Sequence, residues 1–131
     1  MVVETKFHAT CINSQVADGV ALLALADDEL NPSQYILLQR TLEPDQQDRN
    51  LGHDKVHIEL NSQVQSTYCD VEQAQVQRGR IVLQIDAKTA SRLSSHKTID
   101  ITFDVTAAQL DEMRQQLRLL LGDEKVQDSV K

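Results

Sequence analysis

The residues best suited to chemistry in this 131-residue chain gather between positions 45 and 59. This stretch contains Asp45, Gln46, Gln47, Asp48, His53, Asp54, His57 and Glu59. Aspartate, glutamate and histidine are all metal ligands, and paired carboxylates can carry out acid–base chemistry. The two histidines, however, match no recognised metal motif, so we expect neither a metal site nor another bound cofactor.

The local patterns that accompany nucleophilic and nucleotide chemistry are also missing from the sequence. It contains no GxSxG nucleophile elbow, no glycine-rich phosphate loop and no CxxC pair. Its two cysteines, Cys11 and Cys69, lie in or beside strand-like stretches, which is typical of small buried thiols. We therefore predict a protein without catalytic activity, although a small enzyme built on the 45–59 cluster is the competing hypothesis.

The composition argues against nucleic-acid and membrane partners. The net charge is −7, the wrong sign for a phosphate backbone, and aromatic residues, which stack on bases, make up only 3%. The longest apolar stretch, residues 20–26, is too short to span a bilayer, and the N-terminus has no signal-peptide pattern. We expect a cytoplasmic protein that binds neither nucleic acid nor membrane.

The negative charge is concentrated in the first part of the chain. Residues 1–75 hold twelve Asp or Glu and four Lys or Arg, whereas residues 76–131 hold eight acids and nine bases. An acidic surface favours a basic partner, but solubility alone would also account for it.

Alternating apolar and polar residues predict strands over 3–12, 34–41, 55–60, 72–77, 80–85 and 98–105. The uninterrupted apolar run at 20–25 predicts a further strand that is covered on both faces. Arg78-Gly79 predicts a hairpin turn. Between these strands we expect a long polar loop over 42–54, no regular element over 61–69 and a short helical turn near 90–92.

The clearest helix follows Thr106. Thr106 and Gln109 form the pattern of a capping box, and Gly122 stands where a C-cap glycine belongs. The apolar stripe between these signals consists of Leu110, Met113, Leu117, Leu120 and Leu121.

These elements predict an α+β fold in which one mostly antiparallel sheet carries the C-terminal amphipathic helix on one face. We expect a single domain over residues 1–122 and a frayed tail over 123–131. The other face of the sheet should be polar and carry His57, Glu59, Gln73, Gln75, Asp100 and Asp104.

One pattern of residues runs from Tyr35 to Glu59 and continues downstream. It comprises the segments 35–40, 45–48, 51–54 and 58–59, followed by 66–68, 71–72 and 80–83. This pattern resembles the Immunity protein 10 family of bacterial polymorphic toxin systems, and the similarity covers about residues 20–121. Cys69 and Asp70 depart from it, since the family pattern leads us to expect small glycines there.

The resemblance implies a non-catalytic antitoxin that protects the producing cell by binding one cognate protein toxin. From the residue chemistry, we predict that Asp45, Asp48, Asp54 and Glu59 provide steering and charge-assisted hydrogen bonds, and that Tyr68 provides buried area. Two alternatives remain open at this point. In the first, the acids belong only to a solvated loop. In the second, the chain is a non-catalytic structural or adaptor domain, with a homodimer through a free strand edge as one version of it.

Overall fold

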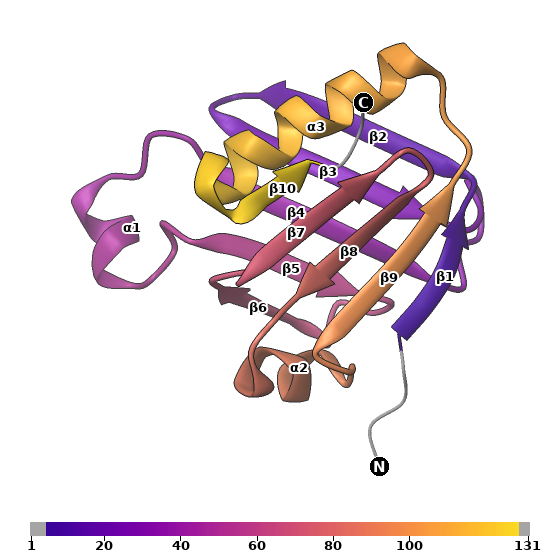
Figure 1. The fold of residues 1–131 in the computed structure, drawn as a ribbon. Helices are drawn as coiled ribbons and strands as arrows, with labels where there is room; N and C mark the ends of the chain where they lie inside the picture. Colours follow the sequence, from indigo (N-terminus) through magenta and orange to yellow (C-terminus); the bar gives the residue numbers. More distant parts are fainter. Residues whose placement is uncertain (1–4, 129–131) are drawn as a thin grey trace.

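The structure is a computed structural model that describes residues 5–128, in which ten strands form two five-stranded sheets (Figure 1). Sheet A has the order β1 (Thr5–Ala9), β9 (Thr98–Phe103), β8 (Arg80–Gln84), β7 (Gln73–Gln77) and β10 (Val126–Asp128). Sheet B has the order β2 (Cys11–Ala17), β3 (Val20–Ala26), β4 (Tyr35–Thr41), β5 (Val56–Leu60) and β6 (Ser66–Cys69). The helices are α1 (Gln46–Asn50), α2 (Ala87–Leu93), α3 (Ala107–Leu121) and the 3-10 turn η1 (Asp123–Lys125).

The predicted α+β class with mostly antiparallel strands is confirmed, but the strands form two sheets instead of one. Sheet B is antiparallel throughout, whereas in sheet A the edge strands β1 and β10 run parallel to their neighbours. The division begins at Thr10, whose N–H donates to the Ala26 oxygen and whose hydroxyl donates to the Asp27 oxygen, both at 2.8 Å. The stretch predicted as one strand over 3–12 therefore becomes two strands in different sheets.

One apolar core lies between the inner faces of the two sheets and α3. Among the residues of this core, Leu23, Ile58 and Ile101 are each at most 1% exposed. The helix α3 packs on the inner face of sheet B, beside β10 (Figure 1). Its capping box and C-cap are confirmed at the predicted residues, and the whole predicted apolar stripe is buried.

The single polar face predicted from the sequence is wrong, because its residues lie on opposite sides of the molecule. His57 and Glu59 lie on the outer face of sheet B, and Gln75 lies on the outer face of sheet A. Asp100 is buried at 4% exposure, and its carboxylate accepts hydrogen bonds from the Arg80 guanidinium, one of them at 2.8 Å.

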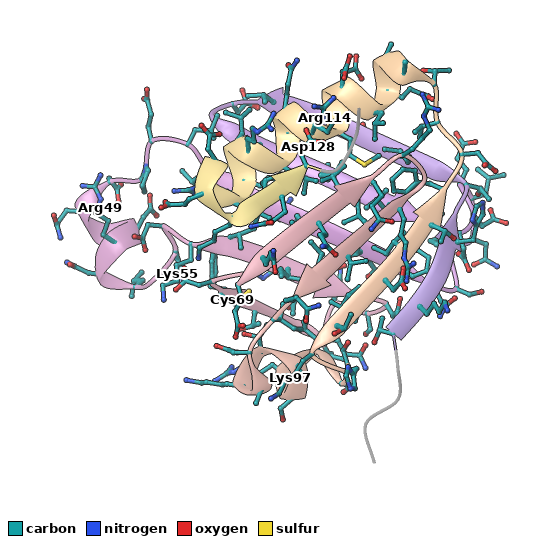
Figure 2. The ribbon with its side chains drawn as sticks, viewed as in Figure 1. Arg49, Lys55, Cys69, Lys97, Arg114 and Asp128 are labelled. Atoms are coloured by element: carbon teal, nitrogen blue, oxygen red, sulfur yellow. The ribbon has the colours of Figure 1, made fainter. Side chains whose placement is uncertain are left out.

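The frayed tail predicted from residue 123 is also wrong for residues 123–128. The strand β10 pairs with β7, and Val126 is only 9% exposed. The Asp128 carboxylate accepts a hydrogen bond from Arg114 Nε at 2.5 Å, and Figure 2 shows the two side chains together beside α3. Burial of Val126 and this ion pair hold the segment against the domain, and residues 129–131 lie outside the described part of the chain.

Candidate partner-binding face

The outer face of sheet B is left uncovered by other elements, since α3 and sheet A lie on its other side (Figure 1). In β3 the residues alternate between buried and half-buried positions, so the prediction of a strand covered on both faces is wrong. Leu22, Ala24 and Ala26 lie on this outer face, and Leu37 of β4 lies beside Ala24. A row of apolar side chains in the middle of the sheet is therefore only partly buried.

An aromatic cluster lies at the β5–β6 end of this face. Tyr68 is paired with His57 across the two strands, and their rings meet edge to face with centroids 4.8 Å apart. The ring of His53, from the loop before β5, stacks on Tyr68 at 4.4 Å. Tyr68 nevertheless remains 42% exposed, so it presents a ring of fixed orientation to solvent.

Glu59 and Tyr35 form a polar pair beside this cluster. The Tyr35 hydroxyl donates to Glu59 Oε2 at 2.6 Å, and the Tyr35 backbone N–H donates to Asn61 Oδ1 at 2.8 Å. Burial, reinforced by the hydrogen bond and the charge of Glu59, raises the pKa of Tyr35 to about 12. The Tyr35 hydroxyl therefore stays a donor, and the Glu59 carboxylate is held in place on the outer face.

Asp45 and Asp48, two of the predicted binding acids, are instead engaged in a helix cap. The predicted loop over 42–54 contains α1, which projects from the end of the sheet (Figure 1). Asp45 Oδ1 accepts the Asp48 N–H at 2.8 Å, and Asp48 Oδ2 accepts the Asp45 N–H at 3.1 Å. Both groups contribute to the acidic field of this end, but one oxygen of each already has a local partner.

Asp54 has different neighbours from the other predicted residues. It lines a hollow of about 200 Å³ together with the cationic residues Arg40, Lys55 and Lys125. Lys55 also forms an ion pair with Asp70 at 3.1 Å. Asp54 therefore lies among bases, and of the five predicted residues only Glu59 and Tyr68 come together on the outer face.

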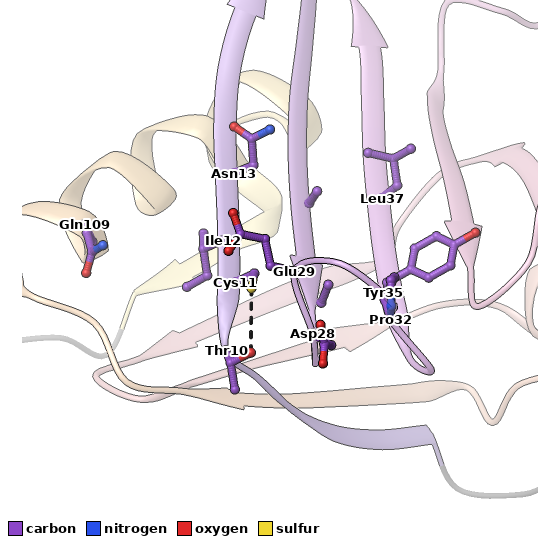
Figure 3. Close-up of a pocket in the computed structure, with 12 residues that line it drawn as sticks. Thr10, Cys11, Ile12, Asn13, Asp28, Glu29, Pro32, Tyr35, Leu37 and Gln109 are labelled. Atoms are coloured by element: carbon purple, nitrogen blue, oxygen red, sulfur yellow. Dashed lines mark hydrogen bonds between the residues drawn. The ribbon is translucent and has the colours of Figure 1, made fainter.

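A larger hollow, which the sequence gave no reason to predict, lies at the β2–β4 end of the face (Figure 3). Its volume is about 720 Å³, and Ala24, Ala26 and Leu37 contribute its apolar wall. Asp28 and Glu29, from the loop between β3 and β4, stand at its margin (Figure 3). The three consecutive acids at 27–29, with no base nearby in the sequence, are the signal that could have indicated it.

The Asp28 carboxylate is fixed in its charged form by the loop itself. Its Oδ1 accepts the backbone N–H groups of Leu30 at 2.9 Å and Asn31 at 3.2 Å. These hydrogen bonds lower the pKa of Asp28, because they favour the ionised carboxylate. The larger hollow therefore keeps a negative charge at its margin.

The acidic character of the chain belongs to sheet B and its loops. Residues 11–69 hold nine Asp or Glu and three Lys or Arg, which gives −6 of the net charge of −7. Of the three bases, Arg40 points to the inner side, where it donates to the Leu119 and Leu120 oxygens at 3.4 and 3.3 Å. The outer face itself carries Glu59, and the other acids of this segment lie in the turns, loops and short helix α1 that join its strands.

Cys69 has the environment of a structural thiol. It is 6% exposed, and burial raises its pKa to about 11, whereas a nucleophilic thiol needs a lowered pKa. Cys11 lies on β2, at the opposite edge of sheet B, and both thiols are free. Within residues 5–128, no three His, Cys, Asp or Glu side chains are grouped to hold a metal ion, and no helix is long and apolar enough to cross a membrane.

Comparison with protein families gives a match over residues 7–111 to the family described as Immunity protein 10. This chain belongs to the Immunity protein 10 family. The resemblance predicted from the sequence is thereby confirmed, and an immunity role follows for the chain. The matched region contains the whole of sheet B, including the aromatic cluster and the larger hollow. A comparison with curated protein sequences finds no significant match.

Proposed function

We propose that this immunity protein neutralises one cognate bacterial toxin by binding it with the outer face of sheet B. The observation that carries the proposal is the row of apolar side chains, Leu22, Ala24 and Leu37, that stay only partly buried beside an acidic margin. Fold stability gives no reason to leave such a row uncovered, whereas burial against a partner would gain hydrophobic free energy.

The β5–β6 end of the outer face supplies an aromatic ring and a carboxylate to a partner. Tyr68 offers exposed aromatic area at small entropic cost, and Glu59 offers a carboxylate held by Tyr35. Strands lie about 4.8 Å apart, so β2 and β6 are separated by roughly 19 Å. A patch of this width fits within a standard interface of roughly 800 Å² per partner.

The charge of sheet B fits a basic toxin surface, such as a cleft that binds a phosphate backbone. Attraction between the −6 segment and a positive cleft would accelerate association and weaken as salt screens it. Neutralisation in this proposal is stoichiometric and involves no catalysis by the immunity protein.

The proposal is tested by co-expression with the toxin domain encoded immediately upstream, counting surviving cells against a toxin-only control. Wild-type protein should restore survival, and Glu59→Lys should reduce it, because a positive charge then faces the basic partner. The matched control is Gln75→Lys, at an exposed strand position on the outer face of sheet A, which should protect like the wild type. Failure of wild-type protein to protect, when both proteins are expressed and folded, would overturn the proposal.

A further inference from the structure

The strand β2 is an open edge of sheet B. Within the described residues it pairs only with β3, along all seven of its residues. The opposite edge strand, β6, is only four residues long and packs against α2. Of the two edges of sheet B, β2 therefore offers the longer unpaired backbone.

The hydrogen-bond pattern of sheet B indicates which backbone N–H and C=O groups of β2 point away from β3, beyond the edge of the sheet. The Leu42 N–H donates to the Gly19 oxygen at 2.8 Å, so the odd-numbered residues of β3 bond to β4. The even-numbered residues of β3 then bond to their odd-numbered partners on β2. The N–H and C=O groups of Ile12, Ser14 and Val16 are left directed away from the sheet.

This edge is not protected against strand pairing by charge, by proline or by short length. Natural edge strands are guarded by charged residues, proline, bulges or short length. The sequence of β2 is CINSQVA, which contains no charged residue and no proline. Val16 in addition exposes 52% of its surface. An unguarded edge of this length is suited to accept another strand.

The larger hollow passes round this same edge. Its lining includes Ile12 and Gln109 of α3 on the helix side of β2, and Cys11 and Asn13 on the outer side (Figure 3). Asp28 also lines it, and none of its lining residues is a lysine or arginine. A strand added along β2 would therefore run through the hollow and project alternate side chains toward an acidic margin.

We propose that β2 accepts an extended segment of the cognate toxin as a sixth strand of sheet B, with a lysine or arginine of that segment directed to Asp28 and Glu29. The inference rests on the proposed function and specifies how the toxin is held. Main-chain hydrogen bonds to Ile12, Ser14 and Val16 provide the affinity, and the acidic hollow provides the specificity.

A second copy of this chain fits the edge less well than a basic segment does. Its own β2 carries no cation to meet the acids of the hollow. Each copy also brings a net charge of −7, which opposes close approach of two acidic sheets. Both features favour a positively charged partner segment.

The test compares Ser14→Pro with Ser14→Ala in isothermal titration against a catalytically inactive variant of the toxin domain encoded immediately upstream. Proline removes the outward N–H and leaves the β2–β3 ladder bonds intact, whereas alanine removes only the hydroxyl. Ser14→Pro should raise the Kd about tenfold or more, and Ser14→Ala less than about twofold. Circular dichroism and urea unfolding establish that both variants are folded.

A second variant keeps the inference testable if Ser14→Pro does not fold. Asp28→Asn combined with Glu29→Gln removes two charges but keeps the acceptor that holds the loop, and should raise the Kd about fivefold or more at low salt. The control is Glu72→Gln combined with Asp104→Asn, two exposed acids outside sheet B, which should leave the Kd unchanged.

The outcomes separate this inference from the proposed function. If wild-type protein does not bind the toxin domain, the proposed function fails. If the wild type binds and the folded Ser14→Pro and Asp28→Asn/Glu29→Gln variants bind equally well, only the strand-pairing inference is overturned. Sedimentation of the chain alone should show a monomer, and a dimer abolished by Ser14→Pro would assign the edge to a second copy instead.

Discussion

Removal of the Tyr68 ring should weaken toxin binding without unfolding the protein. A tyrosine side chain can bury 150–250 Å², and Tyr68 retains 42% exposure, so roughly 60–105 Å² remains for a partner to cover. At about 25 cal/mol per Å², this area corresponds to about 2 kcal/mol of binding free energy. Tyr68→Ala should therefore raise the Kd roughly 30-fold.

Isothermal titration against the inactive toxin domain measures this change directly. Gln75→Ala is the control, because Gln75 is exposed on the outer face of sheet A and should not contact the toxin. Because Tyr68 also packs against His53 and His57, urea unfolding of Tyr68→Ala must show that most of the protein remains folded. An unchanged Kd in the folded variant would refute the placement of Tyr68 in the interface.

Three further predictions concern stability and are measured by urea unfolding. Leu117→Ala should lower the free energy of unfolding by about 2–5 kcal/mol, because Leu117 is fully buried, whereas Leu119→Ala at a 45% exposed position of the same helix should cost less than about 1 kcal/mol. Val126→Ala should cost about 1–2 kcal/mol, and no loss would mean that β10 does not hold the C-terminal segment. Burial raises the pKa of Cys69 to about 11, so the folded state keeps a proton that the unfolded thiol releases near pH 9. Stability should therefore fall between about pH 9 and pH 11, by on the order of 2–3 kcal/mol, and an equal fall in Cys69→Ala would contradict this assignment.

The parts of the fold that local sequence signals encode were predictable. The helix α3 combines the capping box of Thr106 and Gln109 with an apolar stripe and a C-cap glycine. The hairpin around Arg78-Gly79 joins β7 and β8 at the predicted positions, and α2 forms around the predicted turn near residue 90. Each of these features depends on residues that are close together in the sequence.

The arrangement of the sheets depends on contacts that local patterns do not contain. The stretch 3–12 has no turn residue to mark a break, and the bonds from Thr10 to Ala26 and Asp27 lie where β1 ends and β2 begins. The strand β10 has three residues, too few for a periodic signal, and is held by β7 and Arg114. A parallel pairing of this kind joins segments about fifty residues apart, so the tail appeared unstructured.

The candidate site was predictable by residue type but not by position. Glu59 and Tyr68 lie on the same face because β5 and β6 pair in a register that places both on the outer side. Asp54 was grouped with them by sequence distance, yet it lies among bases at the smaller hollow. The larger hollow was missed because β2, β3 and the loop at 27–34 form it together, and the apolar run of β3 suggested burial on both faces.

Toxin binding by the outer face and open edge of sheet B can be mapped directly. Nuclear magnetic resonance of the isotope-labelled chain, titrated with the unlabelled inactive toxin domain, maps the contact residue by residue. The largest chemical-shift changes should fall on β2, the 27–34 loop, Glu59 and Tyr68. Changes confined to the outer face of sheet A, around Gln75 and Asp100, would contradict toxin binding by sheet B.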